Sequence, residues 1–228
     1  MNTKDIILKL TLDEKLAEWG ASFSGYSCVE GKTTEYLAKY KYAVTIGIRL
    51  LNSVVNEITD VPSYTYFKHY RTVNSLLDNI ALKGAMFLEQ NGYEAFPVPA
   101  SQTVNNLADK YSGVFQHKTG AVIAGLGYIG KSALFISNDY GPRVRLATIL
   151  TDFEPAYNEN MPQGNCGSCR ACVDACPAMA ITGEDAFYGV ERKILFDAEA
   201  CSNYMNTHLK QIGRGSVCGV CMRVCPKG

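Results

Sequence analysis

The chain has 228 residues, 47% of them hydrophobic, and its 22 Lys and Arg residues balance 22 Asp and Glu residues. This length and composition allow a full apolar core without disulfide staples, and the zero formal net charge argues against nucleic acid or an anionic membrane as a partner. The first 20 residues contain no uninterrupted apolar run, so neither a leader peptide nor a membrane span is expected, and we expect a cytoplasmic protein.

The first half of the chain predicts two helices and a strand. Apolar residues at helical spacing predict a helix over residues 5–18, with Gly20 just past its end. The β-branched apolar run at residues 42–51 has the length of a buried strand. Pro62 opens the longest periodic segment, which continues to Gly92 and predicts one long amphipathic helix.

Shorter elements follow. Residues 93–101 predict a short strand, residues 102–113 a short helix, and residues 132–153 two strands around a turn at residues 138–142. A polar, aperiodic stretch at 154–165 predicts a boundary between domains. We expect an α+β protein with an α/β domain at residues 1–155 and a cysteine-rich domain at residues 156–228.

Eight of the nine cysteines lie in the last third of the chain. The first run follows the pattern C-x2-C-x2-C-x3-C-P, which is the ligation pattern of bacterial ferredoxins: Cys166, Cys169, Cys172, Cys176 and Pro177. Three thiolates in such a loop reach one cubane cluster, whereas the x3 step turns the fourth towards a second cluster. Clustered cysteines in a reducing compartment are more often metal ligands than disulfides.

The second run repeats the last three positions of this pattern, and Cys201 is the natural replacement for the missing first position. The spacing predicts two [4Fe-4S] clusters with crossed ligation. Cluster I takes Cys166, Cys169, Cys172 and Cys225, and cluster II takes Cys201, Cys218, Cys221 and Cys176.

Two structural zinc sites are the alternative, although zinc usually takes two separated C-x2-C pairs. The ninth cysteine, Cys28, has no partner at a ligand spacing and is interpreted as a small buried residue.

A glycine-rich segment, "AGLGYIGKSALF" at residues 124–135, matches both the dinucleotide-binding pattern G-x-G-x-x-G and the Walker pattern G-x4-G-K-S. Both loops join a strand to a helix, whereas here a helix-like stretch precedes the glycines and a strand-like stretch follows them. We therefore interpret the glycines as positions where the backbone approaches a flat ligand closely.

The segment "AGLGYIGKSALFISNDYGPRVRLATILTD", together with "CGSCRACVDACP" and "CGVCMRVCP", resembles the epoxyqueuosine reductase family, the cobalamin-dependent iron-sulfur reductases related to reductive dehalogenases. The resemblance covers roughly residues 60–228. It implies a nitroreductase-like α/β domain that holds cobalamin between itself and a ferredoxin-like double-cluster domain, with the nearer cluster reducing the cobalt.

The resemblance also implies cofactor-contact residues. The glycine segment lies beside the corrinoid in such proteins, which gives five candidates in this chain: Gly125, Gly127, Tyr128, Gly130 and Lys131. Arg143 and Arg145 are weaker candidates for the polar edge of the corrinoid. Without the resemblance, Tyr128 would be taken as a core aromatic and the charged side chains as solvated.

This sequence departs from the family in two places. The proton-donating Asp of the family aligns with Tyr111, and Asp109 lies two residues away, so Tyr111 is the candidate donor. The sequence stops three residues after Cys225, whereas the tRNA-modifying members continue into a helical-repeat region. With the zero net charge, this leads us to expect a small-molecule substrate and no nucleic acid.

Three histidines complete the candidate chemistry. His117, upstream of the glycines, is a candidate acid or base. His69 is interpreted as a hydrogen-bonded helix residue, and His208 as a neighbour of cluster II.

The function predicted from the sequence is an iron-sulfur oxidoreductase that passes electrons from a low-potential donor of the ferredoxin or flavodoxin type to cobalamin. Two alternatives stay open: an electron-transfer protein without a substrate of its own, and a reductase that holds FMN in the nitroreductase-like domain. Analysis of the bound cofactor separates the three.

Overall fold

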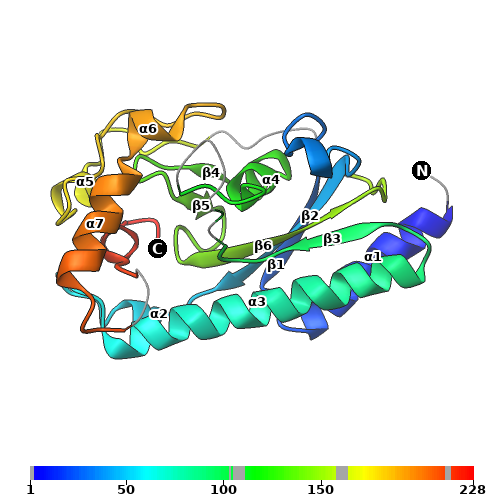
Figure 1. The fold of residues 1–228 in the computed structure, drawn as a ribbon, viewed down its shortest axis with the longest axis horizontal. Coiled ribbons are helices and arrows are strands. Elements are labelled where there is room, and N and C mark those ends of the chain that lie inside the picture. Colours follow the sequence, from blue (N-terminus) through cyan, green and yellow to red (C-terminus); the bar gives the residue numbers. More distant parts are fainter. Residues whose placement is uncertain (1–2, 103, 105–110, 158–163, 214–216) are drawn as a thin grey trace. The chain divides into compact units, whose positions relative to one another are not determined.

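The described part of the chain, residues 3–102, 104, 111–157, 164–213 and 217–228 of a computed structural model, has a mixed α/β fold (Figure 1). The chain divides into two compact units. The sheet unit comprises Met1–Ile48, Val73–Leu126 and Arg145–Pro162. The cysteine unit comprises Arg49–Thr72, Gly127–Val144 and Gln163–Gly228.

A four-stranded sheet with the order β1-β2-β6-β3 forms the centre of the sheet unit. Strand β1 (Phe23–Cys28) pairs antiparallel with β2 (Tyr42–Arg49), and β3 (Ala95–Val98) pairs antiparallel with β6 (Val144–Thr151). Strands β2 and β6 are almost entirely buried, which fits their continuous apolar, β-branched sequences. A 3-10 turn, η1 (Glu35–Leu37), lies between β1 and β2.

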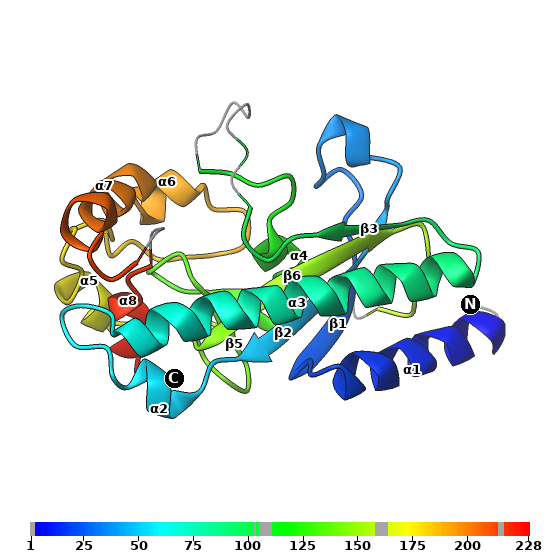
Figure 2. The same cartoon turned by 60° about the horizontal axis from the view of Figure 1, so that its bottom comes forward.

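Two helices pack on one face of this sheet (Figure 2). They are α1 (Thr3–Glu18) and α3 (Tyr64–Gln90), of which residues 73–90 belong to the sheet unit. A Cβ on Gly84 of α3 would lie only 2.5 Å from Cδ1 of Ile149 in β6, and Leu12 and Leu16 of α1 surround the same point. The glycine therefore lets α3 lie close against the strand, where packing is tight.

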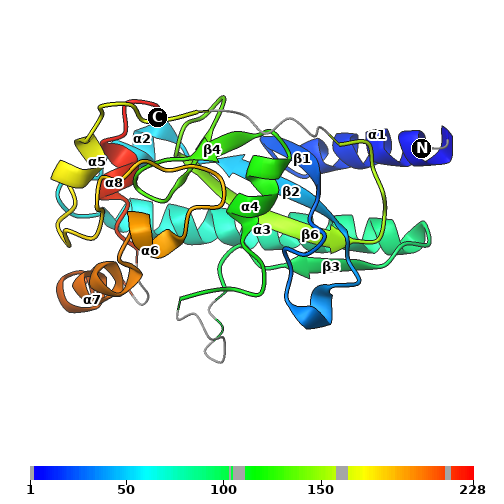
Figure 3. The same ribbon diagram turned by 90° about the horizontal axis from the view of Figure 1, so that it is seen from above.

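Helix α4 (His117–Ile123) covers the opposite face, which Figure 3 shows from the front. A Cβ on Gly120 of α4 would lie 2.5 Å from Oγ1 of Thr45 in β2. A cluster of buried apolar side chains extends this contact beside the helix: Val29, Leu37, Tyr40, Ala43, Val98, Phe115 and Leu150.

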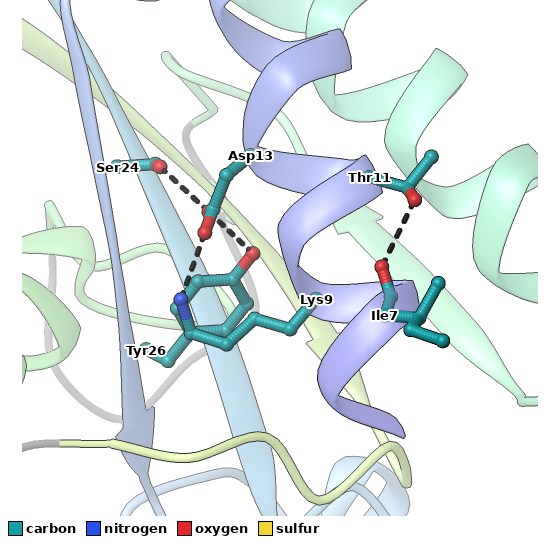
Figure 4. Close-up of polar contacts among 6 residues, drawn as sticks. All are labelled: Ile7, Lys9, Thr11, Asp13, Ser24 and Tyr26. Atoms are coloured by element: carbon teal, nitrogen blue, oxygen red, sulfur yellow. Dashed lines mark hydrogen bonds and ion pairs between the residues drawn. The ribbon is translucent and has the colours of Figure 1, made fainter. Parts of the chain in front are cut away.

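A polar cluster joins α1 to β1 (Figure 4). The Asp13 carboxylate accepts a 2.7 Å hydrogen bond from the Tyr26 hydroxyl, a 3.5 Å bond from Ser24 and a 2.8 Å bond from the Lys9 ammonium. The Lys9 ammonium also lies 4.5 Å from the centre of the Tyr26 ring. Burial and the neighbouring Asp13 charge raise the pKa of Tyr26 far above its usual range. This cluster fixes α1 on the sheet.

The cysteine unit is built of short elements. They are α2 (Asn52–Val55), the start of α3, the hairpin β4 (Gly127–Ile129) and β5 (Phe135–Ser137), α5 (Ala171–Asp174), α6 (Arg192–Leu195), α7 (Ala198–His208) and α8 (Val220–Arg223). Asp197 caps α7, because its carboxylate accepts hydrogen bonds of 2.9 Å from the Glu199 and Ala200 amides.

The predicted helices over residues 5–18 and 62–92 and the predicted strands at 42–51 and 93–101 are confirmed by α1, α3, β2 and β3. The two strands predicted around the turn at 138–142 are confirmed as β5 and β6. They belong to different sheets, because β5 pairs with β4 and β6 joins the four-stranded sheet. The helix predicted at 102–113 lies largely outside the described residues. The domain boundary after residue 155 stays a prediction, and the two compact units group the chain differently.

Among the described residues, none of the helices combines the length and apolar character that crossing a membrane requires.

Candidate metal centre

The first cysteine run forms a tight loop followed by a short helix. The Cys169 amide donates a 3.1 Å hydrogen bond to the Cys166 carbonyl, and α5 begins two residues later and carries Cys172. After α5, the Cys176 amide donates to the carbonyl of Val173. The Cys176 sulfur in turn accepts a 3.4 Å hydrogen bond from the Ala180 amide.

The second run repeats this local shape around α8. Gly219 precedes the helix with a φ of +86°, a left-handed conformation that favours glycine. A Cβ at this position would also lie 2.7 Å from the Tyr66 hydroxyl oxygen. Helix α8, which carries Cys221, contacts α5. The two cysteine runs therefore meet.

The thiols of the first predicted ligand set lie together. Burial raises the pKa of Cys172, and the neighbouring Cys166, Cys225 and Cys169 raise it further. The pKa of Cys225 is likewise raised by burial and then by Cys166 and Cys169. Cys225 comes from the second run, so this group draws three cysteines from one run and one from the other.

The thiols of the second set form the complementary group. Burial raises the pKa of Cys201 to about 11, with further contributions from Cys218, Cys176 and Asp197. The pKa of Cys221 lies far above its usual range, because of burial and four neighbouring thiols: Cys218, Cys201, Cys176 and Cys172. Since Cys172 belongs to the first group, the two groups adjoin each other.

All eight thiols can serve as metal ligands, and all nine cysteines of the chain are free of disulfides. A thiol that binds a metal gives up its proton, and a group of neighbouring thiols therefore suits a thiolate-ligated centre. Within the described ranges, no three His, Cys, Asp or Glu side chains form a group that could hold a single metal ion. The ligands of a cubane cluster lie farther apart than the ligands of a single ion, since each thiolate binds a different iron. The groups coincide with the predicted sets for clusters I and II, and ligation itself stays a prediction.

The end of the glycine segment lies against Cys166. The Lys131 amide lies 3.5 Å from the Cys166 sulfur and donates to it, and the Lys131 ammonium donates a 2.9 Å hydrogen bond to the Gly167 carbonyl. A Cβ on Gly130 would stand 3.4 Å from the Cys166 sulfur. The hairpin β4–β5 therefore forms part of the wall around the first thiol group.

The glycines do not leave an open backbone surface. A Cβ on Gly127 would lie 2.1 Å from the Ile136 carbonyl oxygen, so this glycine permits the close pairing of β4 with β5. The Tyr128 ring packs where a Cβ on Gly164 would be, 2.2 Å from it. Burial raises the pKa of Tyr128, and so do the charges of the cysteines in the first group. Gly125 follows α4 with a φ of +79°. Contact of these residues with a corrinoid stays a prediction.

The two candidate arginines lie in different units. Arg143 is buried, and its Nη1 donates hydrogen bonds of 3.0 and 3.1 Å to the side chains of Asn52 and Asn56. Burial lowers the pKa of Arg143, as does the neighbouring Arg223. In the sheet unit, Arg145 donates to the Asn74 side chain at 2.8 Å and to the Ala100 carbonyl at 3.2 Å. Both guanidinium groups thus have partners within the chain.

The two candidate catalytic residues lie in the sheet unit. Tyr111 has a φ of +68°, and Asp109, the other candidate acid, lies outside the described residues. His117 is half-buried: its Nδ1 lies 2.9 Å from the Thr148 hydroxyl and its Nε2 lies 3.0 Å from the Pro99 carbonyl. Burial lowers the pKa of His117 to about 4. This environment suits a neutral, structural imidazole, and the catalytic role stays a prediction.

Sequence reasoning missed the partners that hold these side chains. The Gly167 carbonyl and the carboxylate of Asp185, 3.3 Å from the Lys131 ammonium, carry no motif. The Asn52 and Asn56 side chains lie four residues apart on one short helical turn, a spacing that places two amides on one face and could have suggested a joint partner.

Residues 165–228 match the family model of the 4Fe-4S double cluster binding domain. The tetrachloroethene reductive dehalogenase of Desulfitobacterium hafniense is 31% identical over 192 residues, which is 78% of this chain and 30% of that protein. The epoxyqueuosine reductase of Cyclobacterium marinum is 32% identical over 116 residues, 46% of this chain and 34% of that protein. The chain therefore spans about a third of the length of these relatives.

Solved structures show the same fold. A reductive dehalogenase, described as suggesting a mechanism for B12-dependent dehalogenation, superposes with a TM-score of 0.74 at 22% identity, over 94% of this chain and 31% of that one. An epoxyqueuosine reductase solved with an epoxyqueuosine-modified tRNA-Tyr stem loop gives a TM-score of 0.63 at 18% identity, over 97% of this chain and 65% of that one. The resemblance to these reductases, stated from the motifs, is confirmed.

Proposed function

We propose that the chain is an iron-sulfur reductase module in which two [4Fe-4S] clusters pass electrons to a corrinoid that reduces a small substrate. The observation that carries this proposal is the crossed grouping of eight half-buried thiols: Cys225 of the second run lies with three cysteines of the first run, and Cys176 of the first run lies with Cys201 and two cysteines of the second run. Two clusters ligated in this way adjoin each other, so electrons can pass between them in series.

The similarity to reductive dehalogenases and epoxyqueuosine reductases supports the reductase activity and the corrinoid. A bound corrinoid would supply a metal that accepts electrons and attacks carbon. On this proposal residues 1–155, which include the four-stranded sheet, are the nitroreductase-like domain. Gly125 and Arg145 of the sheet unit, with Tyr111 as proton donor, are the candidates to meet the cofactor or substrate.

The proposed partner is a low-potential donor of the ferredoxin or flavodoxin type, in a compartment that keeps the cysteines reduced. Two observations favour an electron-transfer protein without its own substrate as the second candidate. Both ring nitrogens of His117 already have partners, and the chain itself fills the space beside Gly127 and Gly130. Retention of a corrinoid separates the two functions.

The first experiment is anaerobic reconstitution with metal and sulfide analysis. We expect about eight iron and about eight sulfide per chain, since eight thiolates complete two cubanes. About two zinc per chain without labile sulfide would contradict both the iron-sulfur clusters and the proposed function.

The second experiment is equilibrium dialysis of the reconstituted protein against cobalamin and FMN in parallel, at micromolar concentrations. We expect cobalamin to be retained. Retention of FMN alone would contradict the corrinoid, and retention of neither would favour the electron-transfer alternative. A Tyr111→Phe variant that binds cobalamin and reduces substrate at full rate would remove only the donor role of Tyr111.

A further inference from the structure

Lys131 has an environment that neither a nucleotide-binding loop nor a corrinoid contact explains. Its side chain is only 9% exposed, and its ammonium donates to the Gly167 carbonyl instead of pointing into solvent. The carboxylate that pairs with it belongs to Asp185, whose side chain is 79% exposed. An exposed partner gives a weak ion pair, so it compensates little of the cost of burying an ammonium group.

The first thiol group would supply negative charge beside Lys131 once its thiols bind a metal. The Lys131 amide donates to the Cys166 sulfur at 3.5 Å, and its ammonium binds the carbonyl of the very next residue, Gly167. A cubane with four thiolates carries a net charge of about −2, and reduction adds another negative charge. A buried cation within this loop therefore becomes more favourable when the cluster is present, and more favourable still when it is reduced.

The hairpin geometry explains why this position is specific. Gly130 has space for no side chain larger than hydrogen without pressing on Ile136, 3.1 Å from its hypothetical Cβ, or on the Cys166 sulfur at 3.4 Å. The tight approach of Gly130 places the next amide and the next side chain on the cysteine loop. Gly130 and Lys131 of the Walker-like pattern thus both contact Cys166: the glycine allows the close approach, and the lysine amide donates to the sulfur.

We propose that Lys131 is a positioning residue for cluster I: its amide and ammonium hold the loop of Cys166 and Gly167 and raise the reduction potential of that cluster. This inference rests on the cluster part of the proposed function and is independent of the corrinoid. Hydrogen bonds to cluster sulfurs and nearby positive charge both stabilise the reduced form, which is the physical basis of the expected shift.

The test compares three variants of the full chain after anaerobic reconstitution. Lys131→Met removes the charge and keeps most of the side-chain volume, Lys131→Arg keeps the charge, and Lys193→Met removes an exposed lysine of the same unit that pairs with Glu191. Iron and sulfide are measured first, and the potentials of the two clusters are then measured by redox titration followed by electron paramagnetic resonance.

We expect Lys131→Met to shift one cluster potential to a more negative value and to leave the other unchanged, with Lys131→Arg and Lys193→Met close to the unaltered protein. Asp185→Asn, which removes the carboxylate beside Lys131, is expected to shift the same cluster in the opposite direction, a result that a purely structural role would not produce. Should Lys131→Met lose iron, Lys131→Gln takes its place in the comparison, because it also removes the charge and keeps a hydrogen-bond donor for the Gly167 carbonyl.

Unchanged potentials in both Lys131→Met and Asp185→Asn, with about eight iron bound, would overturn the role of Lys131 alone. Equal shifts of both clusters would also overturn it, because a charge beside Cys166 must act unequally on the two groups. Absence of labile sulfide from the unaltered protein would overturn both this inference and the clusters, so the two failures are distinguishable.

Discussion

The two units of this chain are stabilised by different forces. In the sheet unit, side chains such as Leu12, Leu16 and Leu150 are at most 1% exposed, and the strands satisfy one another's backbone groups. In the cysteine unit, α5, α6 and α8 have four residues each, and neither α5 nor the longer α7 contains a buried residue. Such short helices are marginal without other bonds.

The difference shows where a metal matters. Apolar burial stabilises the sheet unit, whereas in the cysteine unit the binding energy of a cluster would add to the free energy of folding. The titratable groups differ as well: His117 and Asp13 have hydrogen-bond partners within the sheet unit, whereas the neighbours of the Cys221 thiol are other thiols. Each prediction below perturbs one of the two units.

The largest effect is expected from Cys176→Ala. Because Cys176 lies with Cys201, Cys218 and Cys221, its loss should remove about four of about eight iron and leave cluster I intact. Hydrogen exchange should accelerate in residues 164–213 and 217–228 while β2 and β6 keep their protection. Cys28→Ala, at the end of β1, is the matched control and should keep all the iron. Loss of the cluster on Cys166, Cys169 and Cys172 instead would reverse the crossed assignment.

A perturbation of the sheet unit should leave the iron in place. Leu77 of α3 is fully buried, so Leu77→Ala should cost about 2–5 kcal/mol of the free energy of unfolding measured by native-state hydrogen exchange at β6. The adjacent Leu76 is 40% exposed, and Leu76→Ala should cost about 0.5 kcal/mol or less. Similar costs for the two variants would mean that the face of α3 towards the sheet is wrongly assigned.

The pH dependence of the sheet unit should depend on His117. The pKa of His117 is lowered from 6.5 to about 4 in the folded state, so the unfolded chain binds its proton first as pH falls. Stability from this group is therefore complete above pH 6.5, is lost as pH falls towards 4, and changes no further below that. The total contribution of His117 to the free energy of unfolding is roughly 3 kcal/mol, of which roughly 2 kcal/mol is lost by pH 5.

Hydrogen exchange at β6 between pH 7.5 and 5 measures this loss, and His117→Gln should flatten the profile. The exposed His208 provides the control, since His208→Gln should leave the sheet profile unchanged. An imidazole of His117 that titrates near neutral pH would contradict the structural role and favour the predicted role as acid or base.

The smallest effects are expected at the hydrogen bonds around Asp13 that join α1 to β1. Asp13→Asn removes a charge that three donors share and should cost about 1–2 kcal/mol at α1. Lys9→Met should cost less than about 1 kcal/mol, because the Lys9 and Asp13 side chains are 23% and 33% exposed and solvent screens their pair. Thermal unfolding of the reconstituted protein measures both, and a larger cost for Lys9→Met would show that the ion pair outweighs the Tyr26 hydrogen bond.

The long elements could be predicted because each buries one regular stripe or run. Helix α3 keeps its apolar spacing over 27 residues, and β2 is a continuous apolar strand. Strand β1, with the sequence FSGYSC, was missed because its Ser and Gly residues give no apolar pattern, although Ser27 is fully buried. Strand β4 has three residues and lies within the glycine segment, where glycine weakens any strand signal.

The grouping of the cysteines could be anticipated for a different reason. Ligand number and the x3 step before Cys-Pro constrain which thiols can share a cluster, so spacing carries three-dimensional information. The partner of Lys131 could not be anticipated, because a backbone carbonyl at Gly167, 36 residues away, has no side chain to mark it. The pairing of β5 with β4 likewise depends on one missing Cβ at Gly127.

The cysteine unit is assembled from three separate stretches of chain, and this has a consequence for its synthesis. Its first stretch ends at Thr72 and its last begins at Gln163. At about 5–20 residues per second, the ribosome needs roughly 5–20 s to make the chain between them. During that time the sheet strands can pair, whereas residues 49–72 cannot yet contact the last stretch of their unit. The contacts between these two stretches, which have a high sequence separation, therefore form last. Cluster insertion would then act on a chain whose sheet has already formed.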